Sequence, residues 1–178
     1  PAMRRQRGAA LLLVVAVLFA VTAAAAFATI RREARRDATE LAQQQALAQA
    51  RDALRGLAYQ RHCNDHARPL DTLLACPEAA TEGDAAALCP GLTRGWLPWR
   101  TLGLAPLHDA SGTCLWIERN GLGVRVIAPG APRAGQVRAP DPARVICPGS
   151  ADPAQYLDAS DVALDLTLDP AALTAACP

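Results

Sequence analysis

The chain has 178 residues, enough for one domain with an anchor or a tail, and its formal net charge of +1 hides an uneven distribution. Residues 1–61 hold ten arginines and four acidic residues, a net charge of +6, whereas residues 62–178 hold eight arginines and thirteen acidic residues, a net charge of −5. No basic, aromatic-rich face of the kind used by nucleic-acid-binding proteins is present in this pattern, so we expect no nucleic-acid partner.

The first predicted element is an uncharged apolar stretch, Ala9 to Ile30, which follows the first arginines. As an α-helix its 22 residues would span ~33 Å, enough to cross the hydrocarbon core of a bilayer. A secretion signal usually has an apolar region of only ~7–15 residues. Small residues at 23–26 still offer sites for a signal peptidase, so a cleaved signal stays open beside a retained anchor.

Residues 31–61 predict an amphipathic continuation of the same helix, from about residue 9 to about residue 59. Glu33, Asp37 and Glu40 alternate with arginines and indicate an exposed face. Gly56 weakens the helix and Pro69 forbids its continuation. One stripe is apolar and needs a partner surface. It comprises Ala42, Ala46, Ala50, Ala53 and Leu57, with Leu47 and Leu54 at its edge.

All six cysteines follow the apolar stretch, and none forms a C-x-x-C pair typical of zinc or thioredoxin-like sites. An even number of cysteines after an export-type N-terminus indicates disulfides in an oxidising compartment. Arginines flank the apolar stretch on both sides, so the cysteines decide its orientation, with the N-terminus in the cytoplasm. Six cysteines allow fifteen connectivities. The pairs we expect are Cys76–Cys89, which closes a small ring, then Cys147–Cys177 and Cys63–Cys114.

The remaining residues predict a small antiparallel sheet, and the fold class is therefore α+β. Cys114 to Arg119 and Gly123 to Ala128 alternate like strands around an Asn120-Gly121 turn, which Leu122-Gly123 would lengthen. Residues 143–147 are a third candidate strand, and residues 161–169 alternate like a final edge strand. The Pro/Gly-rich residues 94–112 predict an irregular connection that ends in a tight turn at 108–112.

Side chains that carry chemistry are few, and each has a structural interpretation that we prefer. Trp96, Trp99 and Trp116 could form a ligand platform, but a domain with so few other large side chains needs them in its core. His62 and His66 have the spacing of metal ligands on a helix, but the sequence places no third ligand beside them. We expect no catalytic residues, no metal and no cofactor, and hence not an enzyme.

Two stretches resemble the type IV pilin and type II secretion pseudopilin superfamily. "MRRQRG", ending at Gly8, followed by "AALLLVVAVLFAV" is similar to a class III prepilin leader and its helix. "LPWRTLGLAPLHDASGTCLW" (97–116) is similar to a segment of pilin-like proteins of Gram-negative bacteria. The resemblance implies a leader over 1–8, a transmembrane helix half over 9–30, its amphipathic continuation over 31–61 and a periplasmic globular domain over 62–178. It also implies that a prepilin peptidase cuts between Gly8 and Ala9 and methylates Ala9.

Two departures from that family pattern concern the role of the chain. Members usually have phenylalanine where this chain has Ala9, and glutamate where it has Leu13. Because a tip subunit has no neighbour ahead of it to pair with that glutamate, Leu13 indicates a minor or tip component. The implied function is a pilin-like subunit of a type IV pilus or type II secretion filament, anchored in the inner membrane before assembly. Its implied partners are other pilin or pseudopilin subunits, contacted through the helix, and the prepilin peptidase.

Two other functions remain open at this point. The chain could be a membrane-anchored periplasmic binding or structural domain that never enters a filament. It could also be a secreted enzyme whose signal peptide is removed near Ala26 and whose pocket is lined by tryptophans. The position of N-terminal processing distinguishes the three.

Overall fold

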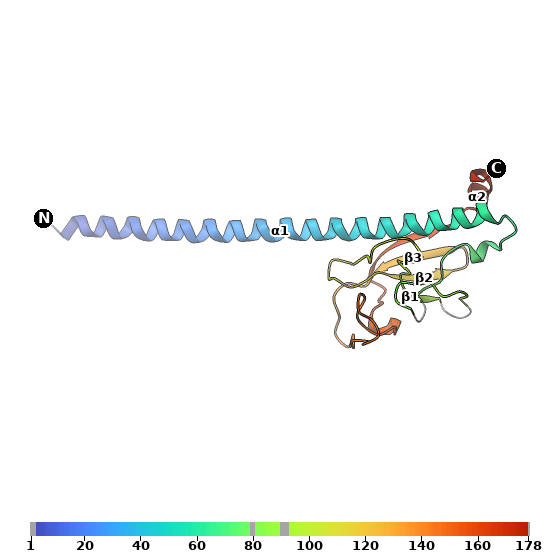
Figure 1. The fold of residues 1–178 in the computed structure, drawn as a ribbon. Coiled ribbons are helices and arrows are strands. Elements are labelled where there is room, and N and C mark those ends of the chain that lie inside the picture. Colours follow the sequence, from blue (N-terminus) through green and yellow to red (C-terminus); the bar gives the residue numbers. More distant parts are fainter. Residues whose placement is uncertain (1–2, 79–80, 90–92, 178) are drawn as a thin grey trace. The chain divides into compact units, whose positions relative to one another are not determined.

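The computed structural model describes residues 3–78, 81–89 and 93–177, with side chains in the first helix from residue 13 onward. The chain divides into two compact units, Pro1–Leu41 and Ala42–Pro178. The helices and strands are α1 (Met3–Asn64), η1 (Leu70–Thr72), β1 (Arg94–Trp96), β2 (Trp116–Asn120), β3 (Gly123–Ala128), η2 (Pro153–Gln155), β4 (Val162–Thr167) and α2 (Pro170–Ala176) (Figure 1). The architecture is α+β, as predicted.

Helix α1 is longer than the sequence suggested. Gly56 does not interrupt it, and it ends at Asn64, where the Asp65 amide still donates to the Arg61 carbonyl oxygen at 3.1 Å. A Cβ atom added to Gly56 would meet nothing within 4 Å, so no close packing requires glycine at this exposed position. The final stop coincides with the approach of Pro69, which cannot continue a helix.

The second half of α1 buries a stripe that is rotated from the predicted one. Leu47, Ala50, Leu54 and Ala58 are buried, whereas Ala42, at the start of the predicted stripe, is exposed. Ala46 and Ala50 are buried as predicted and the half-buried Leu57 packs against the core, whereas Ala53 is only half-buried. The shift toward Leu47 and Leu54 places two large side chains in the core, which removes more apolar area from water.

The sheet is antiparallel with strand order β1-β2-β3-β4. Asn120 pairs with Gly123, so Gly121 and Leu122 form a two-residue turn, and Gly121 has the positive φ of 58° that favours glycine there. The predicted hairpin and the final edge strand, β4, are confirmed. Strand β1 was not predicted, because the whole of residues 94–112 was expected to be irregular.

The sheet separates two apolar clusters, one on each face. On the face toward α1, Leu115, Ile117 and Val126 join the leucines of the helix. On the opposite face Trp96, Trp116 and Ile127 pack with residues of the long β3–β4 connection. Successive residues of a strand point to opposite faces, so the run Leu115-Trp116-Ile117 serves both clusters. Figure 1 shows the second half of α1 lying along the sheet.

Three disulfides tie the second unit together, and no cysteine in the chain is free. Cys76–Cys89 is confirmed. The predicted pairs Cys147–Cys177 and Cys63–Cys114 are wrong, because Cys63 bonds Cys177 and Cys114 bonds Cys147. Helix α2 brings Cys177 to the end of α1, whereas Cys114 lies beside Cys147 on the face of the tryptophans.

Leu54→Ala tests whether the helix and sheet form one core. Leu54 is fully buried, so its truncation leaves a cavity and should lower the free energy of unfolding by about 2–5 kcal/mol. Urea denaturation of the full chain in non-ionic detergent, followed by tryptophan fluorescence, measures this change. Leu41→Ala is the matched control, because Leu41 is exposed and its truncation should change stability by less than about 0.5 kcal/mol. Equal effects of the two substitutions would contradict the packing described.

Candidate functional site

The first part of α1 carries an apolar surface that is exposed in the described structure. The helix is long and apolar enough there to cross a membrane, and none of its most apolar window is buried. Its exposed large side chains are Leu13, Val14, Val15, Val17, Leu18, Phe19, Val21, Phe27 and Ile30. Exposed apolar area of this extent is unfavourable in water, so this surface needs lipid or other apolar helices around it.

The polar groups within the apolar stretch are satisfied inside the helix. Thr22 Oγ1 donates to the Phe19 carbonyl oxygen at 2.9 Å, and Thr29 Oγ1 donates to the Ala26 carbonyl oxygen at 2.8 Å. An unsatisfied hydroxyl in hydrocarbon would be costly. The two threonines are therefore compatible with a lipid environment.

The residues that the sequence assigned to processing and assembly all lie on α1. Gly8 and Ala9 belong to its helical backbone, and the surroundings of their side chains lie outside the described part. Leu13 follows one turn later and its side chain is 66 % exposed.

A charged collar follows the apolar stretch on α1. Arg31, Arg32, Arg35 and Arg36 are exposed, as are the three acidic residues between 33 and 40. In the described structure none of these seven residues forms an ion pair. Their charges are thus available to headgroups, water or neighbouring chains.

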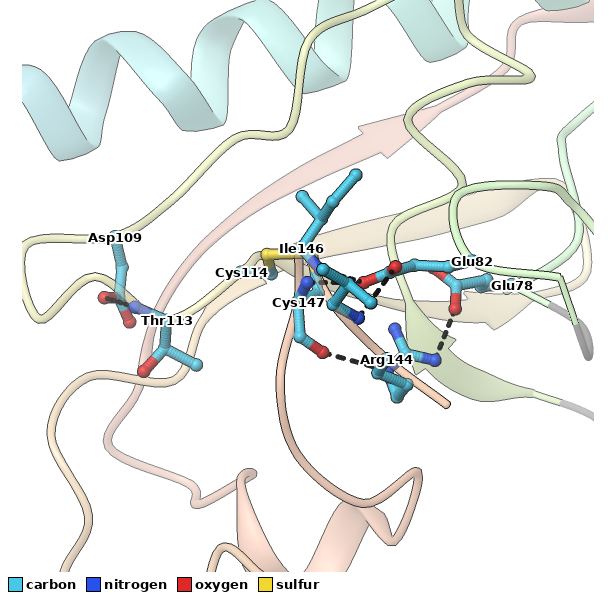
Figure 2. The surroundings of a disulfide bond; sticks show 9 residues. Glu78, Glu82, Asp109, Thr113, Cys114, Arg144, Ile146 and Cys147 are labelled. Atoms are coloured by element: carbon cyan, nitrogen blue, oxygen red, sulfur yellow. Dashed lines mark hydrogen bonds and ion pairs between the residues drawn. A yellow bond between two sulfur atoms is a disulfide. The ribbon is translucent and has the colours of Figure 1, made fainter. Parts of the chain in front are cut away.

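The second unit contains a charged clamp beside the Cys114–Cys147 disulfide, which Figure 2 shows. The Glu82 carboxylate accepts backbone N–H bonds from Val145 at 3.1 Å, Ile146 at 2.9 Å and Cys147 at 2.5 Å. Burial alone would raise the pKa of Glu82, but these three bonds and the nearby Arg144 guanidinium together lower it. The ionised carboxylate therefore holds residues 145–147 in place.

This clamp explains why the prediction of a strand over residues 143–147 was wrong. The amides of residues 145–147 turn toward the Glu82 carboxylate, and those of Ala143 and Arg144 bond Asp141, so none of them pairs with a neighbouring strand. Sequence periodicity carries no information about such a partner, which lies 63 residues away in the chain.

A buried ion pair adjoins the clamp. Arg144 Nη1 lies 2.5 Å from Glu78 Oε1, and both side chains are almost fully buried. Burial raises the pKa of Glu78, although the hydrogen bond from Arg144 acts in the opposite direction. Arg144 also donates Nε–H to the Cys147 carbonyl oxygen at 2.9 Å and lies 5.0 Å from the Trp96 ring centroid. One side chain thus joins residues 78, 96 and 147.

The tryptophans belong to the core, as predicted, and do not form an open platform. Trp96 and Trp116 lie 4.5 Å apart between ring centroids, and Tyr156 packs on both. All three rings are at most 2 % exposed. Trp99 joins the same cluster with 8 % exposure.

The turn at residues 108–112 is built around one carboxylate, as predicted for an Asx turn. Asp109 Oδ1 accepts from the backbone amides of Ser111 at 2.8 Å and Thr113 at 3.0 Å, and Oδ2 accepts from the Gly130 amide at 2.6 Å. Asp109 is therefore occupied by backbone donors. Figure 2 shows its bond to Thr113.

The two candidate metal-ligating histidines are neighbours at the end of α1. The ring centroids of His62 and His66 lie 5.4 Å apart, with His62 buried. Within residues 3–78, 81–89 and 93–177, no group of three or more His, Cys, Asp or Glu side chains has the arrangement of a metal site. The structure therefore shows the two histidines as a pair of rings in contact.

No protein family, curated protein or solved structure gives a significant match to this chain. What the structure establishes is a pilin-like architecture: a long, apolar N-terminal helix whose later part packs on a four-stranded antiparallel sheet with three disulfides. One membrane-capable helix and a disulfide-bonded domain are consistent with a membrane-anchored protein outside the cytoplasm.

Glu82→Gln tests the clamp through its pH dependence. Because folding lowers the pKa of Glu82, its stabilisation is complete above the ordinary value of 4.5 and is lost as the pH falls through the lowered folded value. At neutral pH the free energy of unfolding of the variant should be about 1 kcal/mol lower than that of the wild type. This difference should vanish in acid.

Chemical denaturation over a pH series, read by tryptophan fluorescence, measures both effects. Glu40→Gln is the control, because Glu40 is exposed on α1 and forms no ion pair in the described structure. A wild-type advantage over Glu82→Gln that persisted in acid would contradict the clamp.

Proposed function

We propose that the chain is a minor or tip pilin-like subunit of a type IV pilus or type II secretion filament, held in the inner membrane before assembly. The observation that carries the proposal is helix α1. It contains an exposed, membrane-capable stretch, and it continues into a segment whose leucines belong to the core of the disulfide-bonded unit. A cleaved secretion signal would not explain why the helix continues into this packed segment.

In this proposal the apolar surface of α1 serves two environments in turn. It first contacts lipid, and an assembly machine then moves the subunit so that contacts with other helices replace the lipid contacts. Small residues allow helix backbones to approach closely in an apolar environment. Ala23, Ala24, Ala25 and Ala26 supply such residues in the middle of the stretch.

Leu13 supports a special position within the filament. A glutamate in the apolar stretch would need a positively charged partner on a neighbouring subunit, because an unpaired charge in hydrocarbon is costly. The exposed Leu13 makes no such demand. A subunit with nothing ahead of it, at the tip, suits this side chain best.

The disulfide-bonded unit supplies specific contacts in this proposal and carries out no catalysis. Its Asp109, Glu82 and Glu78 side chains are engaged by backbone amides or by Arg144. The periplasm is the compartment in which its three disulfides would form.

The processing site tests this function first. Intact-mass and N-terminal analysis of the protein from its native membrane should give a chain that begins at methylated Ala9. Gly8→Val should leave the leader attached, because a branched side chain replaces the residue that fits the peptidase. Gly56→Val is the matched control, since the helix leaves open space around Gly56, and it should be processed normally.

The other outcomes of this measurement contradict the proposal. A start near Ala26 would show a soluble exported domain, which favours the secreted-enzyme alternative. A chain that keeps residues 3–8 would show a permanent anchor, which favours the binding-domain alternative.

Photo-crosslinking tests filament assembly separately. With benzoylphenylalanine at Phe19, which is 75 % exposed, ultraviolet light should join α1 to the apolar helix of another leader-bearing subunit. The analysis is mass spectrometry of the crosslinked peptides from cells with an active assembly system. Benzoylphenylalanine at Gln49, which is exposed beyond the apolar stretch, should not give that product. Adducts with lipid alone at Phe19 would contradict entry into a filament.

A further inference from the structure

A cavity of about 710 Å³ lies in the second unit, where the end of α1, the ring closed by Cys76–Cys89 and the end of β2 meet. This volume is within the ~300–1,000 Å³ typical of ligand pockets. Its lining shares no residue with the apolar surface of α1 or with the clamp, and an inference about it does not depend on the function proposed above.

Three arginines from different parts of the chain line this cavity: Arg61 of α1, Arg68 of the following turn and Arg119 of β2. Each is held in place by a neutral partner. Arg61 Nη1 donates to the Leu73 carbonyl oxygen at 3.0 Å, Arg68 Nε donates to Thr72 Oγ1 at 3.2 Å, and Arg119 Nη2 donates to the Asp71 carbonyl oxygen. The guanidinium groups are thus positioned before any ligand arrives.

The positive charge of these arginines is only partly balanced. In the part of the chain that the structure describes, none of the three forms an ion pair, and Asp71 is the one acidic residue lining the cavity. Burial, followed by the charges of Arg68 and Arg119, lowers the pKa of Arg61. Arg119 Nε is buried and has no hydrogen-bond partner. An anion in the cavity would reduce the repulsion between the arginines.

The rest of the cavity wall is mainly apolar. Pro69, Leu74, Ala86 and Leu88 contribute to it, and Leu88 is 75 % exposed. An inorganic anion would leave these side chains without a partner, whereas a ligand with an apolar body would bury them. Thr93 adds a hydroxyl that suits a peptide amide better than a hydrocarbon chain.

We propose that this cavity binds the C-terminal carboxylate of an apolar peptide segment, with the carboxylate on the arginines and the last side chain against the apolar wall. Guanidinium forks match the planar geometry of a carboxylate and form charge-assisted hydrogen bonds with it. The rest of residues 62–178 is strongly acidic, so the arginines give this position a charge opposite to its surroundings. An incoming chain end is therefore attracted to this position and repelled elsewhere on the unit.

The test uses the full chain with intact disulfides in non-ionic detergent at low ionic strength. Isothermal titration calorimetry compares N-acetyl-leucyl-leucine with its C-terminal amide, which differs only in the charged group. The acid should bind at least about tenfold more tightly than the amide, because charge-assisted hydrogen bonds to the arginines are lost in the amide. No binding of the acid, or equal binding of the two, overturns the proposal.

Variants locate the binding. Arg119→Gln and Arg68→Gln should each weaken binding of the acid by about tenfold or more and leave the amide unchanged. Arg68 is exposed and its side chain bonds only the Thr72 hydroxyl, so Arg68→Gln gives an answer even if Arg119→Gln fails to fold. Arg55→Gln is the control with the same charge change, on an exposed part of α1 that does not line the cavity. Weakening by Arg55→Gln equal to that by Arg68→Gln would overturn the assignment.

Two further ligands distinguish a peptide carboxylate from other anions as the bound group. Inorganic phosphate and hexanoate should both bind more weakly than N-acetyl-leucyl-leucine. Phosphate binding as tightly would show a general anion site, and hexanoate binding as tightly would show a fatty-carboxylate site. Either result overturns the peptide proposal.

Discussion

One continuous helix has an exposed apolar part and a part that packs in the core of the second unit, and the rest of the structure depends on this division. The backbone of α1 meets its own hydrogen-bonding needs, so side chains alone decide which environment each part enters. From residue 9 to residue 30 they are uncharged and mostly apolar, and Thr22 and Thr29 turn their hydroxyls back to the helix. After residue 41 the leucines form one stripe that has to meet a complementary surface.

The sheet supplies that surface, and its small size makes covalent and ionic ties important. Four strands of three to six residues bury one face against α1, and the other face carries Trp96 and Trp116, which pack with Trp99 and Tyr156. Residues 129–161, between β3 and β4, contain only one short 3₁₀ helix. Such long irregular connections are uncommon unless something holds them. The connection between β3 and β4 is held by the Cys114–Cys147 disulfide and by the Glu82 carboxylate. Arg138 also holds it, since its Nη1 donates to the Gly130 carbonyl oxygen at 2.7 Å.

Features with a period in the sequence were predictable, and features made by single distant partners were not. The apolar run predicts α1, and the turn residues around 121 predict the β2–β3 hairpin. The alternation of residues 161–169 predicts β4. Strand β1 has only three residues, and Gly95 within it lies so close to Pro77 that a Cβ atom would not fit, a contact that no local pattern reveals. The pairing of Cys63 with Cys177 depends on where α2 places the tail. The amides of residues 145–147 bind Glu82, and spacing in the sequence does not indicate this carboxylate.

The Cys63–Cys177 bond also determines how the unit would respond to mechanical load. The two cysteines are 114 residues apart in the chain, and one lies within the last turn of α1. A tension applied between α1 and residue 177 passes through a single covalent bond and bypasses the sheet. Fully extended, the bypassed segment would reach on the order of 400 Å, and the bond removes that extensibility. A subunit pulled along α1 would keep its folded unit as a closed ring in which no strand bears this force.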